Sequence, residues 1–172
     1  MSLLNPNSDK NWVTGLFRSR EDAERAYRLA EQRGYTRDDI NLLMSEETRK
    51  QHFVDDKGTK ALEGAGAGSA IGGTVGAVIA AIAAIGTSLA LPGLGIVIAG
   101  PLAAAFAGAG AGGLTGGLIG ALVGAGIPEE RAKHYEQGVK EGGIVMGLQP
   151  RTPADAEYFE REWKGYGHHV YR

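Results

Sequence analysis

The chain has 172 residues, with 18 basic and 20 acidic side chains and no cysteine. That length suits one ordinary domain with an insertion, and the missing cysteine excludes disulfides, thiolate catalysis and cysteine-ligated metals. Because the charges balance and no basic cluster stands out, nucleic acid is not an expected partner. Charged residues fill 9–63 and 129–172 and are absent between them, so two polar arms flank an uncharged centre.

The first arm predicts a strand, a helix and a second strand. Residues 12–17 and 40–44 are short apolar runs typical of strands. Between them Ser19 is placed as a helix N-cap, with Asp22 three residues later, and Gly34 as the residue that ends the helix. The expected buried face of this helix follows helical spacing: Ala23, Ala26, Tyr27 and Ala30.

The uncharged centre, residues 64–128, predicts a long antiparallel helical hairpin. Its glycines recur every four residues in two series, which places each series on one stripe of a helix and lets another backbone approach closely. The two series mirror each other about Leu94, where Pro92, Gly93 and Gly95 predict the turn. The predicted packing and assembly positions are Gly64, Gly68, Gly72, Gly76, Gly108, Gly112, Gly116, Gly120 and Gly124.

The sequence allows two environments for this hairpin, a lipid bilayer or an assembly of several copies of the chain. A helix over residues 64–91 would reach about 42 Å, enough to cross a hydrocarbon core of about 30 Å. Basic residues beside both ends would then place those ends on the cytoplasmic side, and the N-terminus shows no secretory signal. The tip, residues 90–101, has no charge and no side-chain donor, which predicts burial either part-way into a bilayer or among copies of the chain.

The last arm repeats the logic of the first. A helix after Pro128 leads to a strand over residues 144–148. Thr152 is then placed as an N-cap before Pro153, and residues 168–171 form a final strand. The expected inner faces of the two helices are Ala132, Tyr135 and Val139, and Ala156, Phe159 and Trp163.

Two β-α-β halves predict an α+β fold, a ferredoxin-like sandwich in which four strands are backed by two helices on one face. The hairpin interrupts this fold between the second and third strands, which are expected to be antiparallel neighbours. The predicted divisions are residues 1–60 for the first half and a charged connector, 61–127 for the hairpin, and 128–172 for a connecting helix and the second half.

Residues that could carry chemistry are few. His168 and His169 would point to opposite faces of a strand and cannot chelate one ion together. His52 and His134 flank the hairpin and could approach each other, but no metal-ligand spacing supports a site. The glycines of 108–113 match the spacing of a dinucleotide-binding motif without the strand and acidic residue that the motif needs. We therefore expect no cofactor, no metal site and no enzymatic activity.

Two segments carry a resemblance to a family. Residues 13–53, with "GLF" before an acidic, alanine-rich helix and then "DDINLLMS", and the run "GIPEERAKHYEQGVKEGGIVMGL" after the uncharged centre are similar to small bacterial general stress proteins, the heat-induced, general stress protein 17M-like group. The resemblance covers most of the chain and implies a stress-induced, non-enzymatic protein. Its motifs are structural, so it carries over no functional residues.

Three functions fit the sequence. The first is a stress-response protein that self-associates through the glycine-zipper hairpin in or against a membrane, with itself and lipid as partners. The second is a soluble homo-oligomeric scaffold or cage whose hairpins pool into a shared apolar interior that could hold lipid. The third is a small-molecule sensor, which rests on analogy of fold alone.

Overall fold

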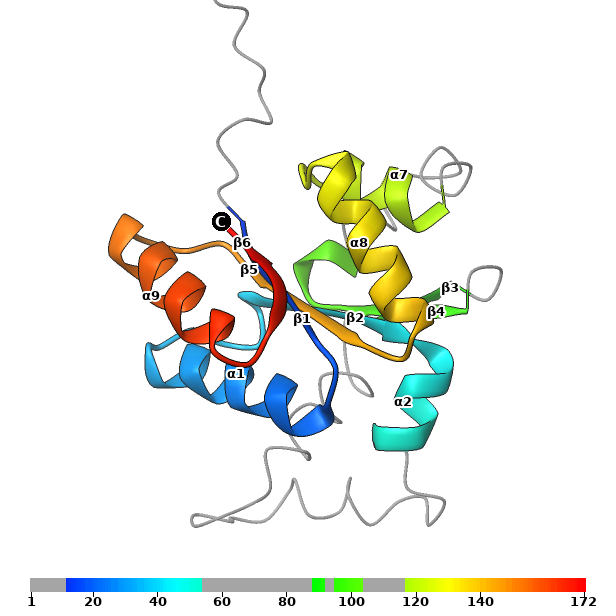
Figure 1. Ribbon diagram of the computed structural model, residues 1–172, viewed down its shortest axis with the longest axis horizontal. Helices are drawn as coiled ribbons and strands as arrows, with labels where there is room; N and C mark the ends of the chain where they lie inside the picture. Colours follow the sequence, from blue (N-terminus) through cyan, green and yellow to red (C-terminus); the bar gives the residue numbers. More distant parts are fainter. Residues whose placement is uncertain (1–11, 54–87, 92–94, 104–116) are drawn as a thin grey trace, which may run out of the picture.

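The structure is a computed structural model that describes residues 12–53, 88–91, 95–103 and 117–172. The described strands form one antiparallel sheet in the order β3-β4-β2-β5-β1-β6. Helices α1 (Arg20–Gln32) and α9 (Pro153–Lys164) cover one face of it, and α7 (Gly117–Gly124) and α8 (Glu129–Lys140) cover the other (Figure 1). The domain mixes helices and strands in three layers. The two helices that the sequence places on one face, α1 and α9, do share a face, while the sequence does not predict a helical layer on the other.

The first arm forms the elements that the sequence predicts. β1 (Val13–Phe17) leads into α1, and β2 (Ile40–Ser45) follows. The Asp22 amide donates to the Ser19 hydroxyl, which confirms the predicted N-cap, and Gly34 adopts a φ of +79° after the helix. The predicted inner face is buried in full: Ala23, Ala26, Tyr27 and Ala30. The charged connector begins as helix α2 (Glu46–Phe53).

The second arm also agrees with prediction. β5 (Ile144–Leu148) and β6 (His168–Tyr171) flank α9, whose N-cap is Thr152 and whose first residue is Pro153. The loop from α8 to β5 turns at Gly142, which has a φ of +90°. The predicted inner faces of α8 and α9 are buried at Ala132, Tyr135, Val139, Phe159 and Trp163, while the remaining predicted position, Ala156, is only partly buried.

β5 lies at the centre of the arms, antiparallel to β1 on one side and to β2 on the other. Phe17 pairs with Ile144, and Leu42 pairs with Met146. All five residues of β1 and of β5 are buried. Strands covered by helices on both faces need such continuous apolar runs, since neither face meets water.

The centre of the chain departs from the prediction. Where two long helices are predicted to meet, the chain forms two strands, β3 (Ser88–Leu91) and β4 (Ile96–Ala99). They pair as a β-hairpin with Leu91 opposite Ile96, and β4 joins the sheet beside β2. The chain does turn back near Leu94, and Gly95 takes a φ of +63° there. The other two predicted turn residues, Pro92 and Gly93, lie outside the described residues.

The hairpin tip is also buried in a different place from the one predicted. All four residues of β4 are buried within the domain, where Ile96 and Ile98 pack in the same cluster as Leu118 and Leu122 of α7. The run of β-branched side chains suits a strand covered on both faces, and pairing with β2 satisfies its backbone. The residues of β4 are therefore buried in the domain's own sheet and core, and not in a bilayer or an oligomer core as the sequence predicts.

Asn41 fastens the residues after β4 to the sheet. Its side chain is 2% exposed, and its Oδ1 accepts from the Leu102 amide at 2.7 Å while its Nδ2 donates to the Gly147 carbonyl at 3.3 Å. Gly100 approaches so closely that a Cβ there would lie 2.3 Å from the Ile40 carbonyl oxygen. Only glycine fits at that position.

We expect Asn41→Ala to lower the free energy of unfolding by about 2–3 kcal/mol, because it removes two hydrogen bonds inside the domain and takes away the side-chain acceptor of the buried Leu102 amide. Urea denaturation followed by circular dichroism measures the change. Gln149→Ala, which removes an exposed amide nearby, should change stability by less than about 0.5 kcal/mol. Equal stabilities of the two variants would contradict this role for Asn41.

Candidate functional site

The glycine positions predicted to drive assembly are only partly described. Gly120 and Gly124 lie in α7. The other predicted positions lie outside the described residues and stay predictions: Gly64, Gly68, Gly72, Gly76, Gly108, Gly112 and Gly116. None of the helices in the described ranges is long and apolar enough to cross a membrane.

α7 has one face in the domain core and one face outside it. Leu118, Ala121 and Leu122 are buried. Gly120, Val123 and Gly124 are exposed, and their spacing puts them on one side of the helix. A Cβ added at either glycine would come within 4 Å of no described atom. The described domain therefore makes no use of this outer face, on which Val123 is 41% exposed, the one large exposed hydrophobic side chain in the described part of the chain.

The β-hairpin lies between the two glycine-rich stretches in the sequence. Residues 64–87 lead into β3 at Ser88, and residues 104–116 follow Ala103, just after β4. Because Ser88 pairs with Ala99, the start of β3 and the end of β4 lie at the same end of the hairpin. The first stretch therefore joins the hairpin at this end, whereas the second begins five residues beyond Ala99, after the Leu102 amide has bonded to Asn41 of β2.

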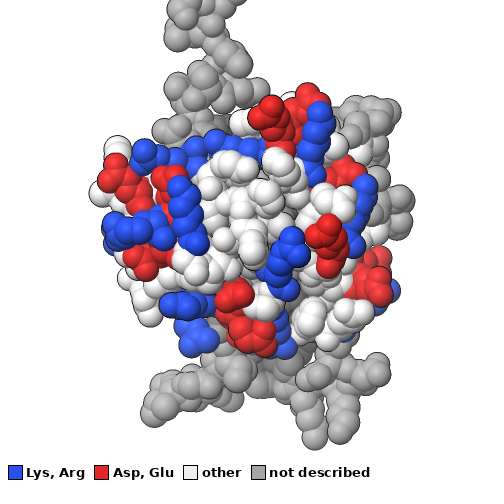
Figure 2. Space-filling view, viewed as in Figure 1, with Lys and Arg blue, Asp and Glu red and all other residues white. Residues whose placement is uncertain are grey.

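A second cluster lies where α8 packs against β6, and it is not predicted from the sequence. The ring of His134 stacks on that of His169, with centroids 4.4 Å apart and planes 9° apart. Beside them, the Arg131 guanidinium lies 4.7 Å above the ring of Tyr171. These elements lie under a broad uncharged area, with charged side chains around it, on the face shown in Figure 2. The signal in the sequence is the spacing of these residues: Arg131 and His134 are three apart on the helix, and His169 and Tyr171 are two apart on the strand.

The buried side chain of Tyr135 lies beneath the stack of His134 and His169 and supports it through hydrogen bonds. It is fully buried, and its hydroxyl bonds to the Thr14 hydroxyl at 2.6 Å and donates to the His169 carbonyl at 3.0 Å. Burial is the main cause that raises the pKa of Tyr135 well above its ordinary value, so the phenol stays protonated. The one side chain thus ties α8 to both β1 and β6.

The stack is not a metal site. A ring nitrogen binds a metal in the plane of its ring, and two parallel rings one above the other offer no shared point in both planes. Among the described residues no group of three or more potential ligands is placed to hold an ion. His52, which the sequence allows near His134, lies at the end of α2, where its carbonyl accepts from Arg20 at 2.6 Å.

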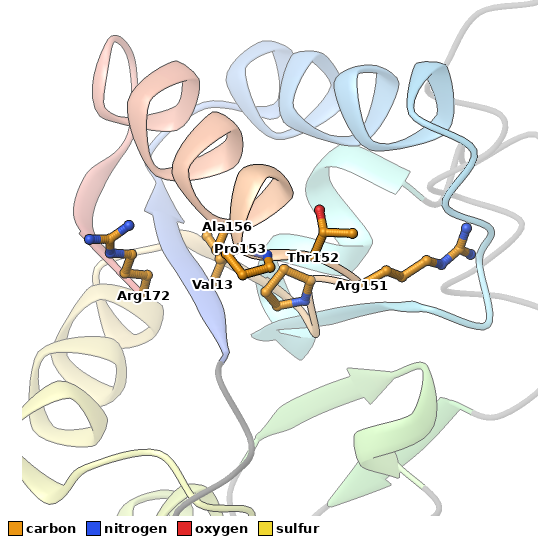
Figure 3. A pocket seen from close by; sticks show the side chains of 7 residues that line it. Val13, Arg151, Thr152, Pro153, Ala156 and Arg172 are labelled. Atoms are coloured by element: carbon orange, nitrogen blue, oxygen red, sulfur yellow. The ribbon is translucent and has the colours of Figure 1, made fainter.

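A pocket of about 460 Å³ opens beside the start of α9. Figure 3 shows Val13, Pro153 and Ala156 grouped at its centre, while Arg151 and Arg172 extend away in opposite directions. Arg151 pairs with Asp39 at 2.8 Å and Arg172 with Glu160 at 3.0 Å. Both guanidiniums are thus neutralised within the domain, and the pocket presents an apolar floor without a built anion site.

Arg151 takes part in a group of contacts between the two arms, which we call the brace. Its residues are Arg33, Tyr35, Asp39, Arg151 and Asp155. The Tyr35 hydroxyl donates to Asp155 Oδ2 at 3.0 Å and accepts from the Arg151 amide at 2.7 Å. Arg33 adds an ion pair to Asp155 at 2.7 Å. These contacts join the loop after α1 to the start of α9.

Comparison of the chain with protein-family models, with curated proteins and with solved structures found no match in any of the three. The functional argument therefore depends on the geometry above.

We expect the brace to make stability depend on acid pH. Hydrogen bonds from Thr36 lower the pKa of Asp39; for Asp155, partial burial opposes ionisation, but the bonds from Arg33 and Tyr35 outweigh it and lower its pKa. Both carboxyls thus contribute stability that is complete above their ordinary pKa of 3.8 and is lost as the pH falls below 3.8 and through their lowered pKa in the folded protein.

Urea midpoints at several pH values between about 3 and 7 measure this dependence. Asp155→Asn should make the curve flatter at the acid end, whereas Asp38→Asn, at a neighbouring position that takes no part in the brace, should not. Curves of the same slope for the wild type and Asp155→Asn would contradict the prediction.

Proposed function

We propose that the chain is a non-enzymatic protein that self-associates through its glycine-rich segments. The observation that carries the proposal is the outer face of α7, where Gly120 and Gly124 border the exposed side chain of Val123. Glycine costs a helix about 1 kcal/mol per position relative to alanine, and nothing in the described domain offsets that cost. Close packing against a second glycine stripe would offset it and cover Val123.

The anchoring of the hairpin supports the same proposal. One glycine series precedes β3 and the other follows β4, and since these strands pair with each other, both series are joined to the same hairpin. An array of such stripes can extend from one copy of the chain to the next. The nine positions proposed for this packing remain those of the two series, with Gly120 and Gly124 as the part presented by the described domain.

The position of β3 and β4 bears on the surroundings. A pair of membrane spans needs the tip of the hairpin on the far side of the bilayer, but residues 95–103 belong to the domain. The returning stretch, residues 104–116, would reach about 20 Å as a helix, less than the roughly 30 Å of a hydrocarbon core. We therefore favour association among copies of the chain, with lipid as a surface that the assembly could contact.

We further propose a ferredoxin-like arrangement for the two arms, extended at one edge by β3 and β4. Its support is the order β2-β5-β1-β6, in which β1 and β2 are separated by β5, and β5 and β6 by β1. The packing of α1 and α9 in one cluster on one face agrees with two right-handed crossovers. The resemblance to general stress proteins, on which the proposed stress-response role depends, rests on these same arms.

Gly120→Leu should abolish the assembly. Because a Cβ at this position meets no described atom, the domain should keep its fold, while leucine would hold a second backbone away from the stripe. Light scattering coupled to gel filtration gives the mass. We expect a multiple of the chain mass for the wild type and a single chain for the variant.

Two further variants sharpen this test. Gly72→Leu, in the other series, should act like Gly120→Leu, and Glu157→Leu adds the same side chain on an exposed position of α9 and should leave the mass unchanged. A wild type of single-chain mass, or an assembly that survives both glycine variants, would contradict the proposal.

Lipid contact is tested separately by fractionation and by flotation with vesicles. If copies of the chain cover the glycine stripes, the protein should stay in the supernatant without detergent and elute as one defined particle. Extraction only with detergent would show instead that lipid covers them, and the self-association proposal would then fail in favour of membrane insertion.

A further inference from the structure

We propose that the stacked rings of His134 and His169 form an acid-sensitive latch, which holds β6 on the domain at neutral pH and releases it when both rings are protonated. The latch lies on α8 and β6, away from the outer face of α7, and it does not depend on the proposed self-association. The argument starts from the contacts that keep β6 in place.

β6 is held by side chains of α8 that alternate with its own. Arg131 and His134 are three residues apart on one side of the helix, and His169 and Tyr171 are two apart on one side of the strand. Arg131 covers Tyr171, and His134 covers His169. The Arg131 guanidinium also donates to the Arg172 carbonyl at 2.9 Å.

Besides these contacts, β6 is held by its pairing with β1 and by Val170, which is buried in the core cluster beside Trp163 of α9. β6 is an edge strand whose one partner among the described strands is β1. The pairing is irregular: Thr14 faces Tyr171 and Leu16 faces His168, so β6 has one residue more than β1 over this stretch. His169 lies in that bulge with a φ of +47°, a backbone conformation that persists only where surrounding contacts impose it.

Desolvation and the neighbouring positive groups oppose the protonation of His169. The side chains of His134 and His169 are exposed, and the partial desolvation of His169 within the stack comes first among the causes that lower its pKa, followed by the neighbouring His134, His168 and Arg18. None of these causes is a carboxylate. Across from β6, α8 contributes His134, Arg131 and the neutral phenol of Tyr135; the acid that follows α8, Glu141, lies 3.6 Å from Arg18.

The sign of the effect follows from this depressed pKa. The folded protein binds a proton at His169 less readily than the unfolded chain, whose histidine has the ordinary pKa of 6.5. The stabilisation from the uncharged stack is therefore complete above pH 6.5 and is lost as the pH falls below that value. Once both rings carry a proton, they repel each other face to face beside Arg131.

Release of β6 would bare the edge of β1, an uncharged strand that could then pair with another strand. Hydrogen exchange of the backbone amides tests the release directly. After correction for the intrinsic pH dependence of exchange, the protection of β6 amides should fall about tenfold or more between about pH 7.5 and 5, while β5 keeps its protection. Equal protection of β6 at both pH values would overturn the proposal.

Two variants identify the group responsible. His134→Phe keeps a flat ring over His169 but cannot take up a proton, so it removes the repulsion between two charged rings and should weaken the pH dependence of β6, leaving the part that comes from the desolvation of His169. His52→Phe, on α2, should leave that dependence as in the wild type. If His134→Phe retains the full dependence, or His52→Phe abolishes it, the latch is not the stacked pair. The gel-filtration mass at pH 7.5 reports on self-association independently.

Discussion

Antiparallel pairing of β5 with both β1 and β2 is the interaction on which the rest of the structure depends. It brings the two arms of the chain together around one strand, with Leu42 opposite Met146 and Phe17 opposite Ile144. Because β5 occupies one edge of β2, the other edge is open to β4, and the uncharged centre joins the sheet there. The same pairing leaves the second edge of β1 to β6. Both ends of the sheet, and the features attached to them, follow from this central strand.

The two edges of the sheet carry different features. At one, the β3–β4 hairpin lies between the two glycine-rich stretches in the sequence, and Asn41 fastens the chain that leaves it. At the other, the short bulged strand β6 packs against the His134 ring and the Arg131 guanidinium of α8. The first edge supports the proposed association of copies, and the second supports a response to acid. The domain between them supplies rigidity through two apolar clusters, one on each face of the sheet.

The sequence predicts the arms well, because their signals are local. The caps at Ser19 and Thr152, the glycine after α1 and the helical spacing of buried residues act within a few positions. The centre is different: a short apolar run such as Ile96–Ala99 fits a buried strand and a buried helix equally, and pairing with β2 decides between them. The glycine spacing favours a helix because periodicity is a local signal. It carries no information about a strand partner that lies far away in the sequence. The histidine stack lies beyond such prediction as well, since it requires a bulge and a left-handed residue at His169.

The central claim is that the outer face of α7 meets another copy of the chain. The wild type contains no cysteine, so a single Val123→Cys substitution places one thiol on that face. Mild oxidation at low protein concentration should then give a covalent dimer on a non-reducing gel, because a disulfide forms only where two Cα atoms come within about 7 Å. Glu157→Cys, on the opposite side of the sheet, should stay a single chain. A Val123→Cys protein that forms no more dimer than Glu157→Cys would contradict the account.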